Sequence, residues 1–290
     1  MGIIGIDHVQ KSVLDRPANS RPKRKIDLVA VIPVVILVIL AIVGPYVVPF
    51  SPTTVVGNSY LPPGSTHYFG TDSAGLDVFS RTIAATRLNV FIGIAVAILA
   101  TVVGVILGTL LGINEPAGGV RGTIARGASR LVDLIQAVPG ILIGVVAVAF
   151  YGANVTTLII AIAVIVCPLQ IRLVRTEVLR VRQEGYVEAA KVAGATPFEA
   201  GLRHILPNSV GPALQNMSVL FGIAIIVTAG LGFIGVGLAP PTAEWGSMLA
   251  GGATDALQGN WWSAAFPAAF LAFAVTTVAV ATRRMFSHSN

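Results

Sequence analysis

Six long apolar segments separated by polar stretches dominate the hydrophobicity pattern of the chain. The first, residues 28–48, has about 21 residues without a charge. A helix of that length, rising about 1.5 Å per residue, covers the roughly 30 Å hydrocarbon core of a bilayer. The pattern predicts an all-α polytopic membrane protein of about six transmembrane helices, with both termini on one side. The other predicted spans are about 88–113, 131–151, 155–173, 209–238 and 261–282.

The composition agrees with a membrane protein. The 290-residue chain is 54% hydrophobic and only 11% charged, whereas soluble domains carry roughly 25% charged residues. The first apolar run is longer than the roughly 7 to 15 residues of a secretory signal and lacks a small-x-small cleavage site, so we expect it to be retained. The predicted organisation is a basic cytoplasmic tail at 1–26, a transmembrane domain at 27–285 and a C-terminal tail at 286–290.

Basic residues fall almost entirely on one side of the predicted spans. They occupy the N-terminal tail, the second and fourth loops and the end of the chain. The opposite side has only Arg81 and Arg87, and the loop at 239–260 has neither Lys nor Arg. Because basic loops stay in the cytoplasm, we expect both termini and the fourth loop to be cytoplasmic. The net charge of +6 reflects this asymmetry and contact with anionic lipid, so it does not require nucleic-acid binding.

The fourth loop, residues 186–208, predicts two short helices. Helix-forming residues lead up to Gly194, whose unrestricted backbone commonly ends a helix. Thr196 then suits an N-cap, and Glu199 follows three residues later, which is the spacing of a capping box. The second helix is predicted to end at Pro207, because proline lacks the N–H and restrains the residue before it. On its own, a pair of short helices is compatible with a loop of any function.

The loop carries E-A-A-x-x-x-G at 188–194 and I-L-P-N at 205–208. This spacing resembles the cytoplasmic coupling loop of importer-type ABC transporter permeases. In that family the loop, here about 184–208, docks into a cleft on a separate ATPase subunit and transmits its closure to the membrane helices. The resemblance implies an apolar anchor at Phe198 and a polar contact or helix-orienting group at Glu188. The full set of ATPase-coupling residues that it implies is Glu188, Ala189, Ala190, Gly194, Phe198, Glu199, His204 and Pro207.

Two further stretches narrow the resemblance to one subfamily of these permeases. The outer segment, about 50–86, contains FGTDSAGLDVFSR at 69–81, which resembles the C-type permease subunit of dipeptide, oligopeptide and nickel importers. The glycine-rich stretch at 230–238, followed by P-P and by W-G-S-M-L at 245–249, resembles later elements of the same family. The implied architecture is the type I ABC importer permease fold. Departures, such as Leu76 where the family commonly has Arg, leave the transported solute open.

Several of these residues have two interpretations. Asp72, Asp77 and Arg81 either form a polar turn at the start of the second span or contact a partner. The glycines at 230–238 favour close helix packing over solute binding. The tryptophans are predicted to be interfacial anchors, namely Trp245, Trp261 and Trp262. The polar residues within or beside the spans either bridge helices or contact solute, and they are Gln136, Asn154, Gln170, Gln215, Asn216 and Thr228.

The chain carries no sign of its own energy source. It has no G-x-x-x-x-G-K-[ST] phosphate loop. The predicted spans lack internal ionisable residues, which proton- or ion-coupled carriers place at membrane depth. Cys167 is the single cysteine and is expected to pack inertly, and the four histidines lack metal-ligand spacing. We therefore expect no catalytic site, no metal site and no enzyme activity in this chain.

The resemblance implies a permease subunit of an ABC importer in the cell inner membrane, most simply for di- or oligopeptides. Its implied partners are a homologous second permease, two ATPase subunits that bind ATP and Mg, an external solute-binding protein and membrane lipid. Nickel or another small solute is an alternative within the family. A self-sufficient secondary carrier or channel is the alternative from another class, and it predicts transport by this chain alone, without ATP.

Overall fold

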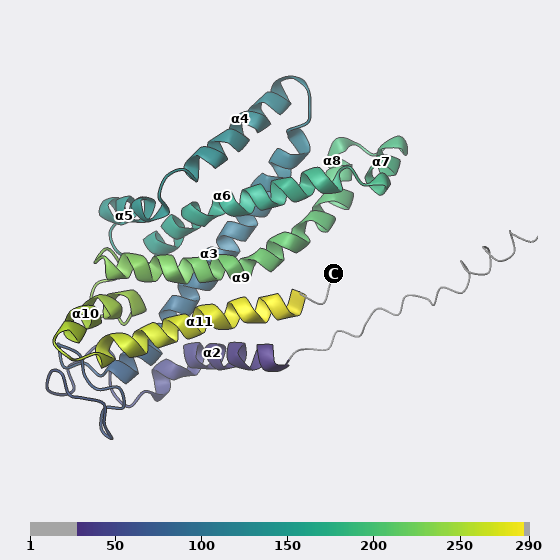
Figure 1. Cartoon of the computed structure of the whole chain (residues 1–290). Coiled ribbons are helices and arrows are strands. Elements are labelled where there is room, and N and C mark those ends of the chain that lie inside the picture. The colour runs from purple at the N-terminus through teal and green to yellow at the C-terminus, as the bar shows by residue number, and fades with distance from the viewer. Residues whose placement is uncertain (1–27, 287–290) are drawn as a thin grey trace, which may run out of the picture.

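The computed structural model describes residues 28–286, which form helices joined by loops (Figure 1). The predicted tail at 1–26 and residues 287–290 lie outside the described residues. The elements are α2 (Leu28–Val47), α3 (Val78–Asn114), α4 (Gly119–Ile135), α5 (Gly140–Tyr151), α6 (Val155–Val181), α7 (Gly185–Val192), α8 (Pro197–Ala200), the π-helical turn η1 (Gly201–Ile205), α9 (Leu206–Phe233), α10 (Trp245–Leu257) and α11 (Trp262–Phe286).

Each predicted span is matched by a helix or a helix pair. Within residues 28–286, four segments are long and apolar enough to cross a membrane, namely α3, α6, η1 with α9, and α11. The bent pair α4 and α5 passes the same test only when its two helices are taken together, and α2 contributes a shorter apolar stretch at Val31–Val47. The chain is therefore a multi-pass, all-helical membrane protein.

The third predicted span is wrong as a single straight helix. The predicted range, 131–151, covers the end of α4 and all of α5, and the axes of these two helices are bent by 87°. Pro139 precedes α5 with a ψ of 117°, outside the helical region, and it has no N–H to continue the helical ladder. The apolar composition continues through this break, so hydropathy alone does not reveal it.

The second span begins ten residues earlier than predicted, because α3 is capped from the outer segment. Asp77 accepts the Ser80 N–H at 2.8 Å and also lies 2.8 Å from Nδ1 of His67. Arg81 Nη1 donates to the carbonyl oxygen of Pro52 at 2.9 Å. Asp77 and Arg81 are both buried, so they hold the outer segment against the start of α3.

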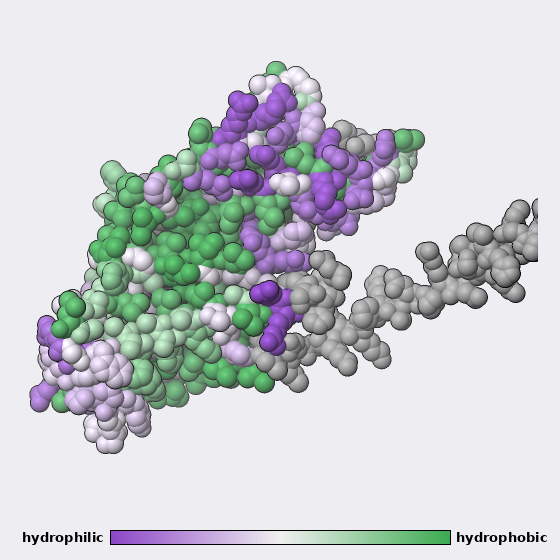
Figure 2. Space-filling model, viewed as in Figure 1, coloured by the Kyte–Doolittle hydropathy of each residue, from purple (hydrophilic) through white to green (hydrophobic). Residues whose placement is uncertain are grey.

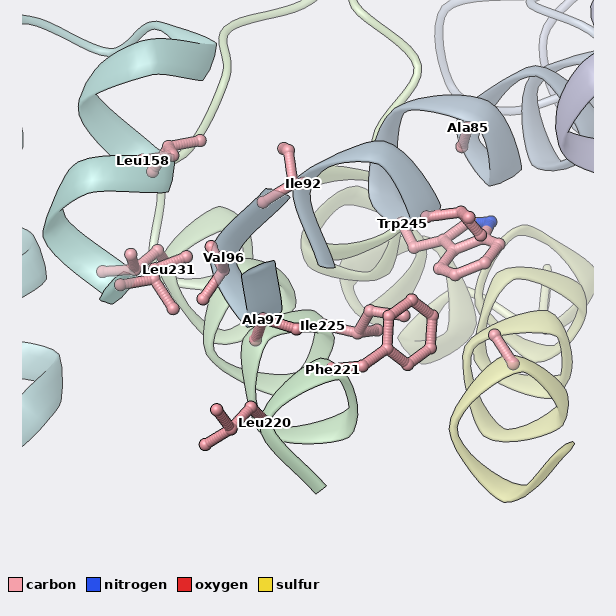
Figure 3. Packing of buried hydrophobic residues seen from close by; sticks show 14 of the residues in the cluster. Ala85, Ile92, Val96, Ala97, Leu158, Leu220, Phe221, Ile225, Leu231 and Trp245 are labelled. Atoms are coloured by element: carbon pink, nitrogen blue, oxygen red, sulfur yellow. The ribbon is translucent and has the colours of Figure 1, made fainter. Parts of the chain in front are cut away.

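The central helix, α3, packs against α6 and α9. Glycines make the approach possible, because a Cβ at Gly108 or Gly112 would come within 2.7 Å of Val174 or Val178 on α6. On the α9 side, a Cβ at Gly93 would meet the Phe221 ring at 2.8 Å, and Figure 3 shows this ring in the buried cluster. Close helix contact through small residues thus forms the core.

Two of the predicted interfacial anchors are instead buried in the fold. Trp245 is fully buried, and its Nε1 donates to the Thr82 carbonyl at 3.1 Å. Trp262 is also buried, and it donates to the Thr71 carbonyl at 3.1 Å. The anchor prediction is wrong for both, because each indole N–H has a protein partner. Trp261 is 56% exposed, as an anchor requires.

The loop between α9 and α10 brings glycines and a buried carboxylate together. Gly246 lies against the Ala229 carbonyl, and Gly232 lies against the Glu244 carboxylate. Glu244 accepts the N–H groups of Gly246 and Ser247 at 2.7 and 2.8 Å and so caps α10. Burial raises the pKa of the Glu244 carboxyl, while these two hydrogen bonds oppose the rise. The packing interpretation of the glycine-rich stretch therefore suits the contacts.

The molecule has two polar ends with an apolar belt between them. The start of α2, the end of α11 and the α7–α8 region lie at one end, and the outer segment and α10 lie at the other (Figure 1). Hydrophobic residues cover the surface between the ends in Figure 2, whereas hydrophilic residues gather over α4 and around α7. This distribution suits a bilayer around the belt.

Candidate coupling segment

The coupling segment, defined here as residues 184–208, comprises α7, α8, η1 and the first turn of α9. Its first helix, α7, ends as predicted at Gly194, where φ is +94°. The Ala195 N–H donates to the Ala190 carbonyl at 3.0 Å, a five-residue closure typical of a Schellman cap. An L-residue rarely adopts this backbone, so position 194 favours glycine for conformational reasons.

The second helix begins as predicted. Thr196 Oγ1 accepts the Glu199 N–H at 3.2 Å, which confirms Thr196 as the N-cap. The Glu199 carboxylate does not complete the reciprocal half of the capping box. It lies 2.7 Å from Arg203 Nη1, one turn further along the chain.

The predicted end of this helix at Pro207 is wrong. The chain passes from α8 into η1 and directly into α9, in which Pro207 occupies the first turn. The Leu206 N–H donates to the Gly201 carbonyl, a wider π-type closure that carries the helix past the proline. Around the proline, Asn208 Nδ2 donates to the His204 carbonyl at 2.7 Å, and Ser209 Oγ donates to the Ile205 carbonyl at 2.8 Å. The coupling segment is therefore continuous with a membrane span.

One face of the segment is anchored on the ends of three spans. Val187 of α7 and Ile205 of η1 are buried in a small cluster with Val174 of α6 and Ala213 of α9. On the α3 side, a Cβ at Gly201 would come within 2.7 Å of Ile113. Displacement of α7 or η1 would therefore displace the packed ends of α3, α6 and α9, because close-packed interiors transmit strain.

The opposite face of the segment is open. Glu188, Ala189, Gly194 and Pro207 are exposed, and Ala190, Glu199 and His204 are half-buried. Phe198 occupies the second position of α8. The motif-based reasoning did not single out Val192, although this apolar side chain is 86% exposed at the end of α7. Its place beside the helix-ending glycine is the signal that would have identified it.

The six polar residues predicted within or beside the spans separate into two groups. Gln170 is fully buried, and its Nε2 donates to the Ala213 carbonyl at 2.8 Å. Its Oε1 accepts from Asn216 Nδ2 at 2.7 Å, so the pair joins α6 to α9. Thr228 is also buried and donates to the Ala224 carbonyl at 2.8 Å. The remaining three are exposed, namely Gln136, Asn154 and Gln215.

Metal coordination has no candidate here. Across residues 28–286, no group of three His, Cys, Asp or Glu side chains lies close enough together to hold a metal ion.

Comparison with known proteins identifies the class. The model of the family described as the binding-protein-dependent transport system inner membrane component matches residues 104–289, and the chain belongs to this family. The protein is thus a permease subunit of an ABC importer with the type I permease fold.

Three relatives illustrate the similarity. The "Probable D,D-dipeptide transport system permease protein DdpC" of Escherichia coli (strain K12) is 35% identical over 237 residues, 81% of this chain and 77% of the relative. The "Dipeptide transport system permease protein DppC" of Bacillus subtilis (strain 168) is 32% identical over 253 residues, which are 86% of this chain and 76% of the relative. The "Glutathione transport system permease protein GsiD" of Pectobacterium atrosepticum is 36% identical over 218 residues, which are 74% of this chain and 70% of the relative.

Proposed function

We propose that the coupling segment docks into a cleft on a separate ATP-hydrolysing subunit and passes its movement into the membrane helices. The observation that carries this proposal is the unbroken passage from α8 through η1 into α9, beside an α7 whose outer face is exposed. A helix that continues into a span acts as a lever, whereas a flexible loop would absorb the displacement. The proposed ATPase contacts are Glu188, Ala189, Ala190, Gly194, Phe198, Glu199, His204 and Pro207, and Val192 joins them.

The proposed assembly contains this chain, a homologous second permease, two ATPase subunits and an external solute-binding protein. ATP and Mg belong to the ATPase subunits, and this chain hydrolyses nothing by itself. The proposed solute is a di- or oligopeptide, which the names of the dipeptide permease relatives support. Predicted spans without internal ionisable residues suit a solute that the external protein has already selected.

The proposed orientation places both termini and the coupling segment in the cytoplasm. The start of α2, the end of α11 and α7 lie at one end of the molecule, where most of the basic loops also lie (Figure 1). Closure of the ATPase pair would shift α7 and η1 as a unit, and α9 would follow. The pathway would then open alternately to the two sides of the membrane.

Reconstitution tests this function. The purified complex is placed in liposomes containing ATP, and uptake of a labelled dipeptide is measured with the binding protein outside. Accumulation that requires ATP supports the importer. Accumulation by this chain alone in empty liposomes, driven by an ion gradient, would instead establish the carrier alternative.

A further inference from the structure

A groove of about 360 Å³ lies between the end of α3 and the start of α4. Its wall is mostly apolar, with one cation and one amide. The lining includes Leu110, Leu111 and Asn114 from α3, and Arg121, Ile124 and Ala128 from α4. The volume falls within the range of about 300 to 1,000 Å³ that is usual for small-molecule sites. Such a lining suits an amphiphile with an apolar body and an anionic head.

The exposed face of α3 indicates where the groove lies relative to the bilayer. Large apolar side chains are exposed along this helix from Phe91 to Leu110. At about 1.5 Å per residue this stretch measures roughly 29 Å, which matches the hydrocarbon core of a bilayer. The polar residues Asn114 and Glu115 follow about one helical turn after Leu110. The groove therefore lies where the hydrocarbon core meets the headgroups.

The charges around the groove favour an anion at its polar edge. Arg121 is exposed, and among the described residues its side chain makes no hydrogen bond or ion pair. The nearby Glu115 carboxylate is paired with Arg175 at 3.2 Å, and Arg126 donates to the Glu115 carbonyl at 2.9 Å. The carboxylate of α4 itself, Asp133, lies three turns further along the helix. The Arg121 guanidinium is thus available for the planar, two-pronged contact that it makes with phosphate.

We propose that this groove binds one anionic phospholipid, with an acyl chain between α3 and α4 and the headgroup phosphate on Arg121. Under the proposed orientation, the lipid comes from the cytoplasmic leaflet, where basic pockets between helices meet anionic headgroups. A bound lipid would join α4, which has few neighbours in the fold, to the central helix α3. The site is separate from the coupling segment, so it does not depend on the ATPase contact.

Native mass spectrometry tests the proposal. The assembled complex in mild detergent is incubated with equal amounts of dioleoyl phosphatidylglycerol and dioleoyl phosphatidylcholine, and the retained lipid is measured. Arg121→Gln should lower retained phosphatidylglycerol about fivefold, since one basic residue near the surface contributes about 1 kcal/mol. Ala128→Phe, which fills the groove without changing charge, should have a similar effect. Arg130→Gln is the matched control on the same helix and should retain as much as the parent.

Three results would overturn the proposal. Equal retention of the two lipids would remove the anion preference, and equal loss from Arg121→Gln and Arg130→Gln would indicate unspecific attraction to a basic helix. Cross-linking of Ala128→Cys to a second permease in the complex would assign the groove to a subunit interface. Melting temperatures within a few degrees of the parent confirm that the variants are folded, and the parent's lipid preference tests the proposal without any variant.

Discussion

Gly201 of η1 lies directly against Ile113 at the end of α3, so close that a Cβ at position 201 would come within 2.7 Å of the Ile113 side chain. Two segments almost 90 residues apart in the chain meet at this point. The contact joins the π-helical turn, which continues directly into α9, to the end of the central helix of the fold. Movement of the coupling segment therefore reaches α3 by contact and α9 by chain continuity.

Enlarging position 201 should weaken this junction. Gly201→Leu is expected to lower the free energy of unfolding by about 1 to 3 kcal/mol, because it overpacks the space that Ile113 occupies. The measurement is the thermal midpoint of the purified chain in detergent. Ile113→Ala in the same chain should recover most of the loss. Gly211→Leu is the control, since the space around Gly211 is open, and an equal loss there would contradict the contact.

Gly194 should resist a β-branched side chain because of its backbone. A non-glycine residue in this left-handed region costs about 1 to 2 kcal/mol, and a β-branched residue costs more. Gly194→Val should therefore distort the end of α7 and reduce ATP-driven uptake at least about fivefold.

Gly185→Val provides the matched control. Gly185 begins the same helix, has equally open surroundings and lacks a positive φ. Uptake per assembled complex is compared for the two variants and the parent. Parent-like uptake by Gly194→Val, or an equal loss in both variants, would show that the left-handed backbone does not matter for coupling.

Gln170 and Asn216 should contribute to stability rather than to solute recognition. Asn216→Leu leaves the buried Gln170 Oε1 without its partner, and interhelical hydrogen bonds of this kind contribute about 0.6 to 1.7 kcal/mol in membranes. We expect a lower thermal midpoint with an unchanged solute concentration for half-maximal uptake. Gln215→Leu, at the exposed neighbouring position, should leave both unchanged. A large shift in the uptake concentration would reassign Asn216 to the solute.

Glu244 should make stability depend on pH. Burial raises its pKa in the folded state, so the folded chain holds this proton to a higher pH than the unfolded chain does. Its contribution is greatest below the unfolded pKa of about 4.3 and is lost as pH rises through the folded value. Glu244→Gln does not titrate and should flatten this part of the midpoint-versus-pH curve. An unchanged slope would contradict the burial argument.

The sequence was sufficient to predict features set by local chemistry. Gly194 and Thr196 end and begin helices through their own backbone and side-chain preferences, and both predictions are confirmed. The predictions that failed depend on tertiary structure. A proline usually ends a helix, but the π turn before Pro207 accommodates it. Trp245 looked like an anchor because its partner, the Thr82 carbonyl, is 163 residues away.

The span boundaries likewise separate what local sequence determines from what it does not. Hydropathy located the apolar stretches but not the ends of the helices, because α3 and α6 continue into polar sequence. The break at Pro139 was also missed, since apolar residues lie on both sides of it. The position of Phe198 in α8 does not by itself establish a contact with an ATPase, so its coupling role stays a prediction.

Co-purification from native membranes tests the central claim most directly. The tagged parent is compared with a Glu188→Ala, Phe198→Ala double variant, and with a control carrying Phe150→Ala on the 82% exposed side chain at the end of α5. The parent and the control should bring along a second permease and ATPase subunits, whereas the double variant should keep the permease and lose the ATPases. Undiminished recovery of the ATPases with the double variant would contradict the proposed docking site. Recovery of the parent alone, moving solute in vesicles without ATP, would contradict the importer itself.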